Sequence, residues 1–148
     1  MIHASNDIPA SSLVDREKIR ELKFTYCDAL DHADIDALVS LFTPDAIYNL
    51  GKFGTYRGHE QIRELLAGLL ATFSLTSHTP TVGKIEVREN EATAIWKALV
   101  AMQPMPSDGA AQPKLAFIDY YDKMVRHDRQ WLFNEIALDF RGEWPIGA

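Results

Sequence analysis

The stretch of sequence that decides the fold is residues 26–50, YCDALDHADIDALVSLFTPDAIYNL. Its pattern predicts the end of one helix, a tight turn, a second short helix over Ile35–Phe42 and a strand over Ala46–Leu50. Asp34 stands directly before the second helix, where a carboxylate can accept hydrogen bonds from the free backbone N–H groups of the first turn. Two helices therefore precede a strand, and the rest of the chain has to supply what they pack against.

Helical patterns lie on both sides of this stretch. Upstream, a helix is predicted from about Val14 to Ala33, because apolar residues recur there at intervals of three and four: Ile19, Leu22, Tyr26, Ala29, Leu30 and Ala33. Downstream, residues 59–73 show the same period, with one apolar face: Ile62, Leu65, Leu66, Leu69 and Leu70. Residues 1–11 contain the polar run Ser5–Asp7 and Pro9, so we expect a flexible N-terminal arm over residues 1–11 and a single domain over residues 12–148.

The second half of the chain has the composition of strands. Four segments are rich in β-branched and aromatic residues: 77–87, 92–102, 115–125 and 130–141. Two of the junctions, residues 89–91 and 127–129, are short and polar, as hairpin turns are. Strands joined in this way form an antiparallel meander, and helices that precede a sheet are typical of an α+β fold. We expect three N-terminal helices over a curved antiparallel sheet, with a pocket between the two layers.

Composition and charge exclude several classes of protein. The chain has 148 residues, of which 47% are hydrophobic and 24% charged, as in one soluble globular domain. The formal net charge of -6 argues against nucleic acid as a partner, because phosphate binding needs a clustered basic surface. Cys27 is the single cysteine and the five histidines lack metal-ligand spacing, so we expect no metal site. The N-terminus lacks the features of a signal peptide, and no apolar run reaches the ~20 residues that span a bilayer. We therefore expect a cytoplasmic protein without a membrane partner.

Several of these segments resemble the SnoaL-like group of the nuclear-transport-factor-2-like superfamily, which includes dehydratases and polyketide cyclases. The matching features are the spacing of Tyr26 and Asp31, the following DALVSLFTPDA, the segments GTYRGHEQI and SHTPTVGKIEV, and the final hairpin with Trp131. The resemblance covers about Ile19 to Arg141. It implies a cone-shaped α+β barrel, a homodimer or homotrimer, and a reaction that needs no metal or organic cofactor.

Within this group the sequence is most similar to the dehydratases and lyases, which pair an aspartate at the position of Asp31 with a histidine at that of His78. From the residues alone, Asp31 can equally end a helix, and a lone histidine on a strand is often a surface residue. As a pair they can act in acid–base catalysis, because the carboxylate fixes the imidazole tautomer and stabilises its cation. Tyr26 lies on the core stripe and is either a packing residue or a third catalytic group that donates a hydrogen bond.

Six further side chains are candidates for substrate binding: Tyr48, Trp96, Val100, Phe117, Tyr120 and Arg141. The two tyrosines could polarise a carbonyl group. Arg141 could hold an anionic group or form a surface ion pair. The other three are core residues that could also form the wall of a pocket.

The sequence therefore predicts a cofactor-independent lyase or isomerase, dehydratase-like in its chemistry, that abstracts a proton from a small hydrophobic, cyclic substrate. Two positions depart from the pattern of the dehydratases: Leu50 replaces a strand tyrosine, and Val100 replaces an acidic or histidine side chain. The alternative is a non-catalytic ligand-binding or association domain, like the small subunit of ring-hydroxylating dioxygenases. An epoxide-hydrolase-like reaction is disfavoured, because in this fold it uses an Asp-Arg-Asp set and no second pocket aspartate is evident.

Overall fold

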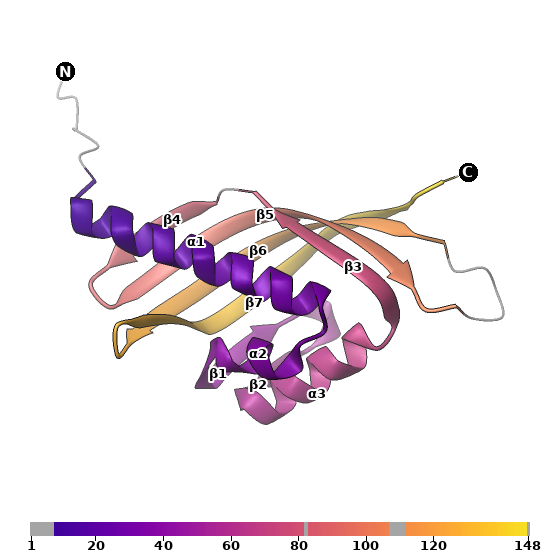
Figure 1. Cartoon of the computed structure of the whole chain (residues 1–148), viewed down its shortest axis with the longest axis horizontal. Helices are drawn as coiled ribbons and strands as arrows, with labels where there is room; N and C mark the ends of the chain where they lie inside the picture. The colour runs from indigo at the N-terminus through magenta and orange to yellow at the C-terminus, as the bar shows by residue number, and fades with distance from the viewer. Residues whose placement is uncertain (1–7, 82, 107–111, 148) are drawn as a thin grey trace, which may run out of the picture.

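Three α-helices pack on a seven-stranded sheet in the computed structural model, which describes residues 8–81, 83–106 and 112–147. The helices are α1 (Ala10–Asp31), α2 (Ile35–Ser40) and α3 (Gly58–Leu70), with a short 3-10 turn η1 (Gly51–Phe53). The strands are β1 (Phe42–Asn49), β2 (Thr55–Arg57), β3 (Phe73–Pro80), β4 (Lys84–Arg88), β5 (Glu91–Pro104), β6 (Lys114–His127) and β7 (Gln130–Pro145). Helix α1 runs along the sheet, and α2 and α3 lie together at one side of it (Figure 1).

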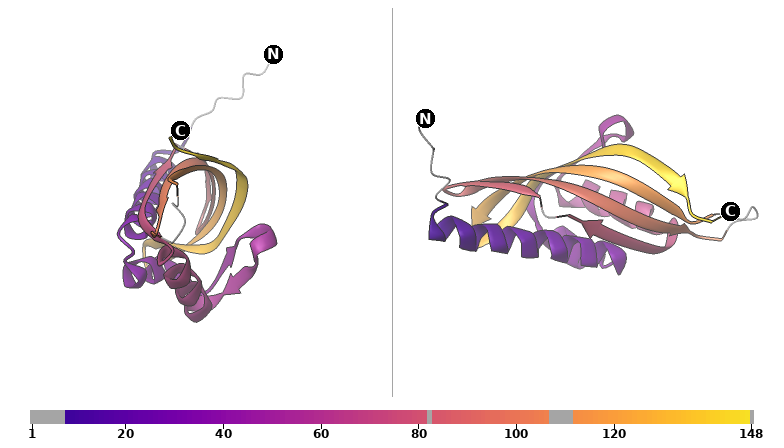
Figure 2. Two further views of the ribbon diagram at one scale, coloured as in Figure 1. Left: turned by 90° about the vertical axis from the view of Figure 1, so that its right-hand side faces the viewer. Right: turned by 90° about the horizontal axis from the view of Figure 1, so that it is seen from above.

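The strands form one sheet in the order β2-β1-β7-β6-β5-β3, and β4 also pairs with β5. The sheet is strongly curved and does not close on itself (Figure 2, left). The predicted α+β fold, three helices over a curved sheet, is confirmed. One pairing differs from a purely antiparallel sheet, because β1 runs parallel to β7. Parallel neighbours need a long connection, and here residues 50–129 separate the two strands in sequence.

The predicted strand over residues 77–87 is in fact two strands. β3 pairs with the second half of β5 and β4 with its first half, so both lie on the same edge of that long strand. The strand is interrupted between Pro80 and Lys84, and at Gly83 the chain lies close to the β5 backbone. A Cβ atom at Gly83 would lie 2.0 Å from the Ile95 carbonyl oxygen, so only glycine fits this passage.

The bounds of the first two helices differ by a few residues from those predicted. Helix α1 begins at Ala10, within the arm expected over residues 1–11, whose residues 1–7 lie outside the described part of the chain. Asp34 caps α2 as predicted, because its Oδ1 accepts a hydrogen bond from a first-turn backbone N–H at 3.0 Å. Helix α2 ends two residues earlier than predicted, since Phe42 already belongs to β1. None of the described helices is both long and apolar enough to cross a lipid bilayer.

Helix α1 is fixed to the sheet by three polar residues spaced eight positions apart: Asp15, Lys23 and Asp31. Asp15 accepts a hydrogen bond from Trp131 Nε1 on β7 at 3.1 Å. Lys23 Nζ donates to Asp122 Oδ2 on β6 at 2.9 Å, and Asp31 reaches β3. All three side chains therefore reach strands of the sheet, and the apolar residues between them fill the core.

Candidate active site

Asp31 and His78 meet where the last turn of α1 lies against β3. His78 Nδ1 lies 2.6 Å from Asp31 Oδ1. The His78 backbone N–H donates to both carboxylate oxygens, at 2.9 Å to Oδ2 and 3.2 Å to Oδ1. Thr76, two residues earlier on the same strand, donates its hydroxyl to Oδ1 at 3.0 Å. One strand therefore holds the carboxylate from three donor groups and fixes the orientation of the imidazole.

The charge state of this pair follows from its surroundings. Burial works to raise the pKa of the Asp31 carboxyl, but hydrogen bonds and charge from His78, with a further hydrogen bond from Thr76, outweigh it and lower the pKa below 3.8. An ionised carboxylate only accepts hydrogen bonds, so Nδ1 of His78 carries the proton that lies between them. The side chains of His78 and Asp31 are 10% and 20% exposed, so the pair is shielded from water but not sealed.

A cavity of about 200 Å³ opens beside His78, between α3 and the sheet. Its wall is mainly apolar and is formed by Leu30, Tyr48, Leu50, Leu69, Leu70, Phe73, Thr76, His78, Val100, Met102, Pro104, Lys114, Ile118, Tyr120, Leu138, Phe140 and Glu143. The ion pair between Lys114 Nζ and Glu143 Oε1, at 2.9 Å, is partly exposed and lies at the mouth. Because Nδ1 of His78 is bound to Asp31, Nε2 is the ring nitrogen available to a ligand in this cavity.

Three buried tyrosines supply most of the other polar groups near the cavity. Tyr48 and Tyr120 line it, whereas Tyr26 lies behind Tyr48 and reaches it through a hydrogen bond of 2.5 Å between the two hydroxyls. Burial raises the pKa of all three phenols above 10.0. All three therefore remain neutral at physiological pH and cannot act as bases, and Tyr48 and Tyr120 can donate hydrogen bonds to a ligand in the cavity.

A second acid–base pair lies in the sealed core next to these tyrosines. Lys23 Nζ donates to Asp122 Oδ2 at 2.9 Å and stands 3.7 Å from the centroid of the Tyr120 ring. The Lys23 and Asp122 side chains are 1% and 0% exposed. Burial raises the pKa of Asp122, and the ammonium of Lys23 and the indole of Trp96 only partly oppose that effect. Trp96 Nε1 affects the pKa of Asp122 without a hydrogen bond of good geometry, because it has no such partner within the described residues.

With this geometry in place, comparisons with known proteins are informative. The sequence model of the SnoaL-like domain family matches residues 11–137, most of the chain. The chain belongs to the SnoaL-like domain family. A relative at the sequence level is the uncharacterized protein Rv2910c of Mycobacterium tuberculosis, 29% identical over 126 residues that cover 84% of each chain.

Two solved structures resemble this SnoaL-like domain closely in fold. A candidate scytalone dehydratase of Novosphingobium aromaticivorans superposes with a TM-score of 0.83 at 23% identity, over 93% of this chain and 91% of the other. A hexachlorocyclohexane dehydrochlorinase, LinA-type3 of Novosphingobium barchaimii, superposes with a TM-score of 0.81 at 21% identity, over 92% of each chain. At these identities the likeness shows that the fold is shared.

Not every residue that the sequence suggested as a substrate contact lies in the cavity of this SnoaL-like domain. Tyr48, Val100 and Tyr120 do line it, with His78. Trp96 is buried in the core but is not part of the wall. Tyr26 is one layer removed, as described above.

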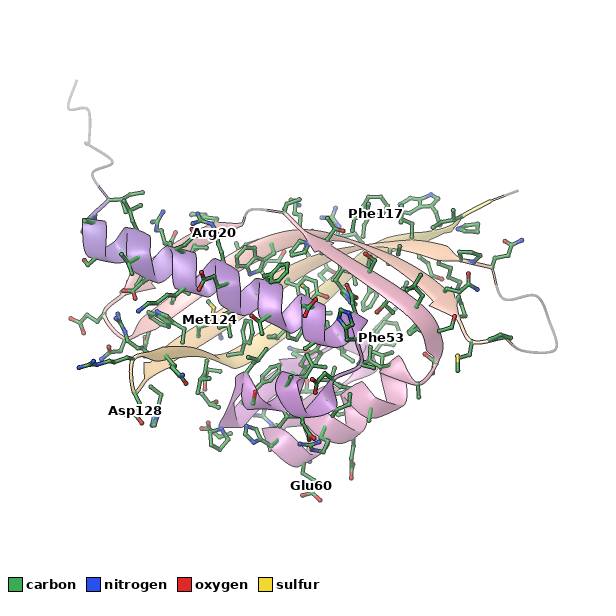
Figure 3. All side chains as sticks on the ribbon, viewed as in Figure 1. Arg20, Phe53, Glu60, Phe117, Met124 and Asp128 are labelled. Carbon is green, nitrogen blue, oxygen red and sulfur yellow. The ribbon has the colours of Figure 1, made fainter. Side chains whose placement is uncertain are left out.

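Phe117 and Arg141 require a correction, because both lie on the outer face of the sheet. Side chains alternate along a strand, and Ile118 points into the cavity, so Phe117 points away from it. Phe117 is 41% exposed and packs edge-on against Trp144, with ring centroids 4.9 Å apart. Figure 3 shows Phe117 on the upper side of the sheet and Phe53 on the lower side, near the helices. Arg141 donates to Asp119 at 3.0 Å on the same outer face.

Sequence patterns missed several residues that shape the site. Thr76 was detectable, because it lies two positions before His78 and so shares its strand face. Leu69 and Phe140 come from α3 and β7, and only the folded chain brings them together at the cavity. Lys23 was also detectable, since it lies four positions after Ile19, on the core side of α1.

Other chemistries find less support in the site. Cys27 is buried, and burial raises the pKa of its thiol to about 12, so it is a poor nucleophile at neutral pH. Across residues 8–81, 83–106 and 112–147, no three His, Cys, Asp or Glu side chains are grouped so that they could hold a metal ion.

Proposed function

We propose that this SnoaL-like domain is a cofactor-independent lyase or isomerase that removes a proton next to a carbonyl group of a small hydrophobic, cyclic substrate. The observation that carries the proposal is the 2.6 Å contact between His78 Nδ1 and Asp31 Oδ1 at the wall of an apolar cavity. The reaction class is supported by the names of two proteins with the same fold, which refer to dehydration and dehydrochlorination.

In the proposed reaction, Nε2 of neutral His78 takes a proton from the carbon next to the carbonyl group. The C–H bond breaks and its electron pair forms a C=C bond, while the π pair of the carbonyl group moves to the oxygen and the imidazole becomes a cation. Asp31 stabilises this cation across the Nδ1 hydrogen bond. The electron pair on the oxygen then re-forms the C=O bond, and His78 returns the proton. The proton goes either to the far carbon of a conjugated enolate, which gives an isomer, or to a hydroxyl group on the next carbon, whose C–O bond breaks to give water and a C=C bond.

The developing oxyanion needs hydrogen-bond donors, and the tyrosines of the cavity wall are suited to that role. Tyr48 and Tyr120 are neutral donors in an apolar wall, where a hydrogen bond to a charged oxygen is stronger than in water. Tyr26 acts through Tyr48, because the hydrogen bond between their hydroxyls orients the Tyr48 phenol. We therefore treat Tyr26 as a positioning residue for Tyr48.

The alternative, a domain used only for association, has less support. Such a domain has no need for an open interior, whereas the cavity here is apolar and holds the imidazole at its wall. A non-catalytic ligand-binding domain would keep the cavity but would not need the partly buried hydrogen bonds that fix His78 against Asp31.

The test is proton exchange with solvent. Cyclohexanone in deuterated buffer should incorporate deuterium next to its carbonyl group faster with the protein than without it. His78→Ala should lower the catalysed rate by about 10²–10⁴-fold, the range of one general acid–base group. Thermal melting of the variant serves as the control for folding. Exchange that continues at the wild-type rate in His78→Ala would rule out the proposed base.

We also propose that the outer face of the sheet is covered by another copy of the chain, in a homodimer or homotrimer. Large apolar side chains are exposed in cross-strand rows there: Ile95 opposite Tyr121, and Leu99 opposite Phe117. An exposed apolar surface of this kind is typical of an interface. Phe117→Glu should therefore give a smaller species in sedimentation equilibrium. A wild-type protein that sediments as a monomer would contradict the proposal.

A further inference from the structure

The cavity beside His78 is small for a binding site that has to enclose a whole substrate. Its volume is about 200 Å³, whereas ligand pockets in proteins usually measure about 300–1,000 Å³. A single ring with a carbonyl group fits such a space, but little more does. Leu69 and Phe140 of its wall also line a second hollow, toward which a larger molecule could extend.

An apolar groove of about 590 Å³ continues in that direction. The cavity and the groove share four wall residues: Leu50, Leu69, Phe140 and Glu143. Beyond them the groove runs over Phe53 of η1, Tyr56 of β2 and Leu65 of α3. The two spaces are therefore direct neighbours, and the imidazole of His78 lies at the wall of the cavity.

The groove offers apolar side chains that the protein itself leaves uncovered. Phe53 is 56% exposed, Phe140 44% and Leu69 41%. Phe53 and Phe140 meet edge-on, with ring centroids 5.9 Å apart, and together form an aromatic corner of the groove. Of the two charged residues in the wall, Glu143 is neutralised by Lys114 at 2.9 Å. The surface of the groove therefore suits a hydrocarbon or aryl group better than a charged group.

We propose that the groove binds an apolar extension of the substrate, so that the natural substrate is an elongated molecule with one carbonyl-bearing ring and an apolar ring or chain attached to it. The inner ring lies in the cavity beside His78, and the extension lies across Phe53 and Leu65. The position of the reacting ring rests on the proposed function, but binding of the extension depends only on the groove.

Calorimetric titration with two ketones tests this assignment. The probes are cyclohexanone, which fits the cavity alone, and 4-phenylcyclohexanone, which adds an aryl group on the side away from the carbonyl. Wild-type protein should bind 4-phenylcyclohexanone at least tenfold more tightly than cyclohexanone, because the aryl group leaves water for the groove. Phe53→Ser, and separately Leu65→Gln, should bring this ratio close to one.

Phe24→Ser is the matched control, because Phe24 is 69% exposed on α1 and contacts neither the cavity nor the groove. It should keep the wild-type ratio. Equal affinities for the two ketones in wild-type protein, no binding of 4-phenylcyclohexanone, or an unchanged ratio in Phe53→Ser would overturn the proposal. A loss of oligomer in Phe53→Ser would overturn it too, since the groove would then be an interface between copies. Proton exchange is measured separately, so tight binding without exchange would refute the proposed chemistry and leave the groove assignment standing.

Discussion

Helix α1 brings several acid–base pairs to the sheet, and two of them, Lys23–Asp122 and Asp31–His78, have different surroundings. Lys23 and Asp122 are 1% and 0% exposed and lie among the rings of Tyr26 and Tyr120. Asp31 and His78, eight residues further along the helix, are 20% and 10% exposed at the wall of a cavity. The same kind of contact between helix and strand is sealed in one place and accessible in the other.

This difference decides what each pair can do. A sealed pair cannot exchange protons with a ligand, and if it loses one partner it leaves a charge buried without compensation. A pair at a cavity wall can change its protonation state during a reaction, because the cost of charging the imidazole is offset by a carboxylate already in contact with it. We therefore assign stability and positioning to the Lys23 pair and proton transfer to the His78 pair.

The largest expected effect is loss of stability when the sealed pair is broken. Lys23→Ala should lower the free energy of unfolding by about 3–5 kcal/mol, because Asp122 then remains buried without its cation. The matched control is the double variant Lys23→Met/Asp122→Leu, which removes both charges and keeps the volume filled. It should be close to wild type or more stable. Urea unfolding distinguishes the two results, and a single variant as stable as the double one would contradict this account.

The next effect concerns activity at the accessible pair. Asp31→Asn should reduce proton exchange severely, because an amide can hold the ring but cannot stabilise its cation and can select the wrong tautomer. The loss should approach that of His78→Ala, about 10²–10⁴-fold. The double variant Asp31→Asn/His78→Ala should be no worse than His78→Ala alone, since the carboxylate has no base left to orient. Losses that multiply in the double variant would mean that Asp31 acts independently of His78.

The contrast between the two pairs also shows what could be predicted from the sequence. The helices and most strands followed from local patterns, and so did the Asp34 cap. The contact of Asp31 with His78 rested on resemblance, because 47 positions separate them and no local pattern fixes such a distance. The direction of the Phe117 side chain was not predictable, since apolar residues occur at both the odd and the even positions of that strand. Lys23 was overlooked because a lysine in a helix usually faces solvent.

A third prediction uses pH, because the two aspartates should respond with opposite signs. The pKa of Asp31 is lowered on folding, so its stabilising contribution is present above its ordinary value of 3.8 and is lost as pH falls through the lower, folded value. The pKa of Asp122 is raised by burial, so folding favours its protonated form and stability falls as pH rises from 3.8 through the folded value. Unfolding free energies of wild type, Asp31→Asn and Asp122→Asn, measured across the acid range, should show how each aspartate makes stability depend on pH. Equal signs for both aspartates would contradict the difference in environment.

The smallest effect is expected at Tyr26, which lies between the two pairs. Its ring touches the Lys23 side chain, with the ammonium 4.8 Å from the ring centroid, and its hydroxyl reaches Tyr48 in the cavity wall. Tyr26→Phe keeps the ring and removes one neutral hydrogen bond, which contributes about 0.5–1.5 kcal/mol. Proton exchange should therefore fall by no more than about tenfold, less than in either variant of the Asp31–His78 pair.

The double variant Tyr26→Phe/Tyr48→Phe decides how Tyr26 acts. If Tyr26 only orients the Tyr48 hydroxyl, the double variant should exchange protons no more slowly than Tyr48→Phe alone, because nothing remains to be oriented. A further loss in the double variant would instead mean that Tyr26 contributes directly to the reaction. In that case the boundary between the sealed core and the reactive cavity would lie one layer deeper, between Tyr26 and Lys23 rather than between Tyr48 and Tyr26.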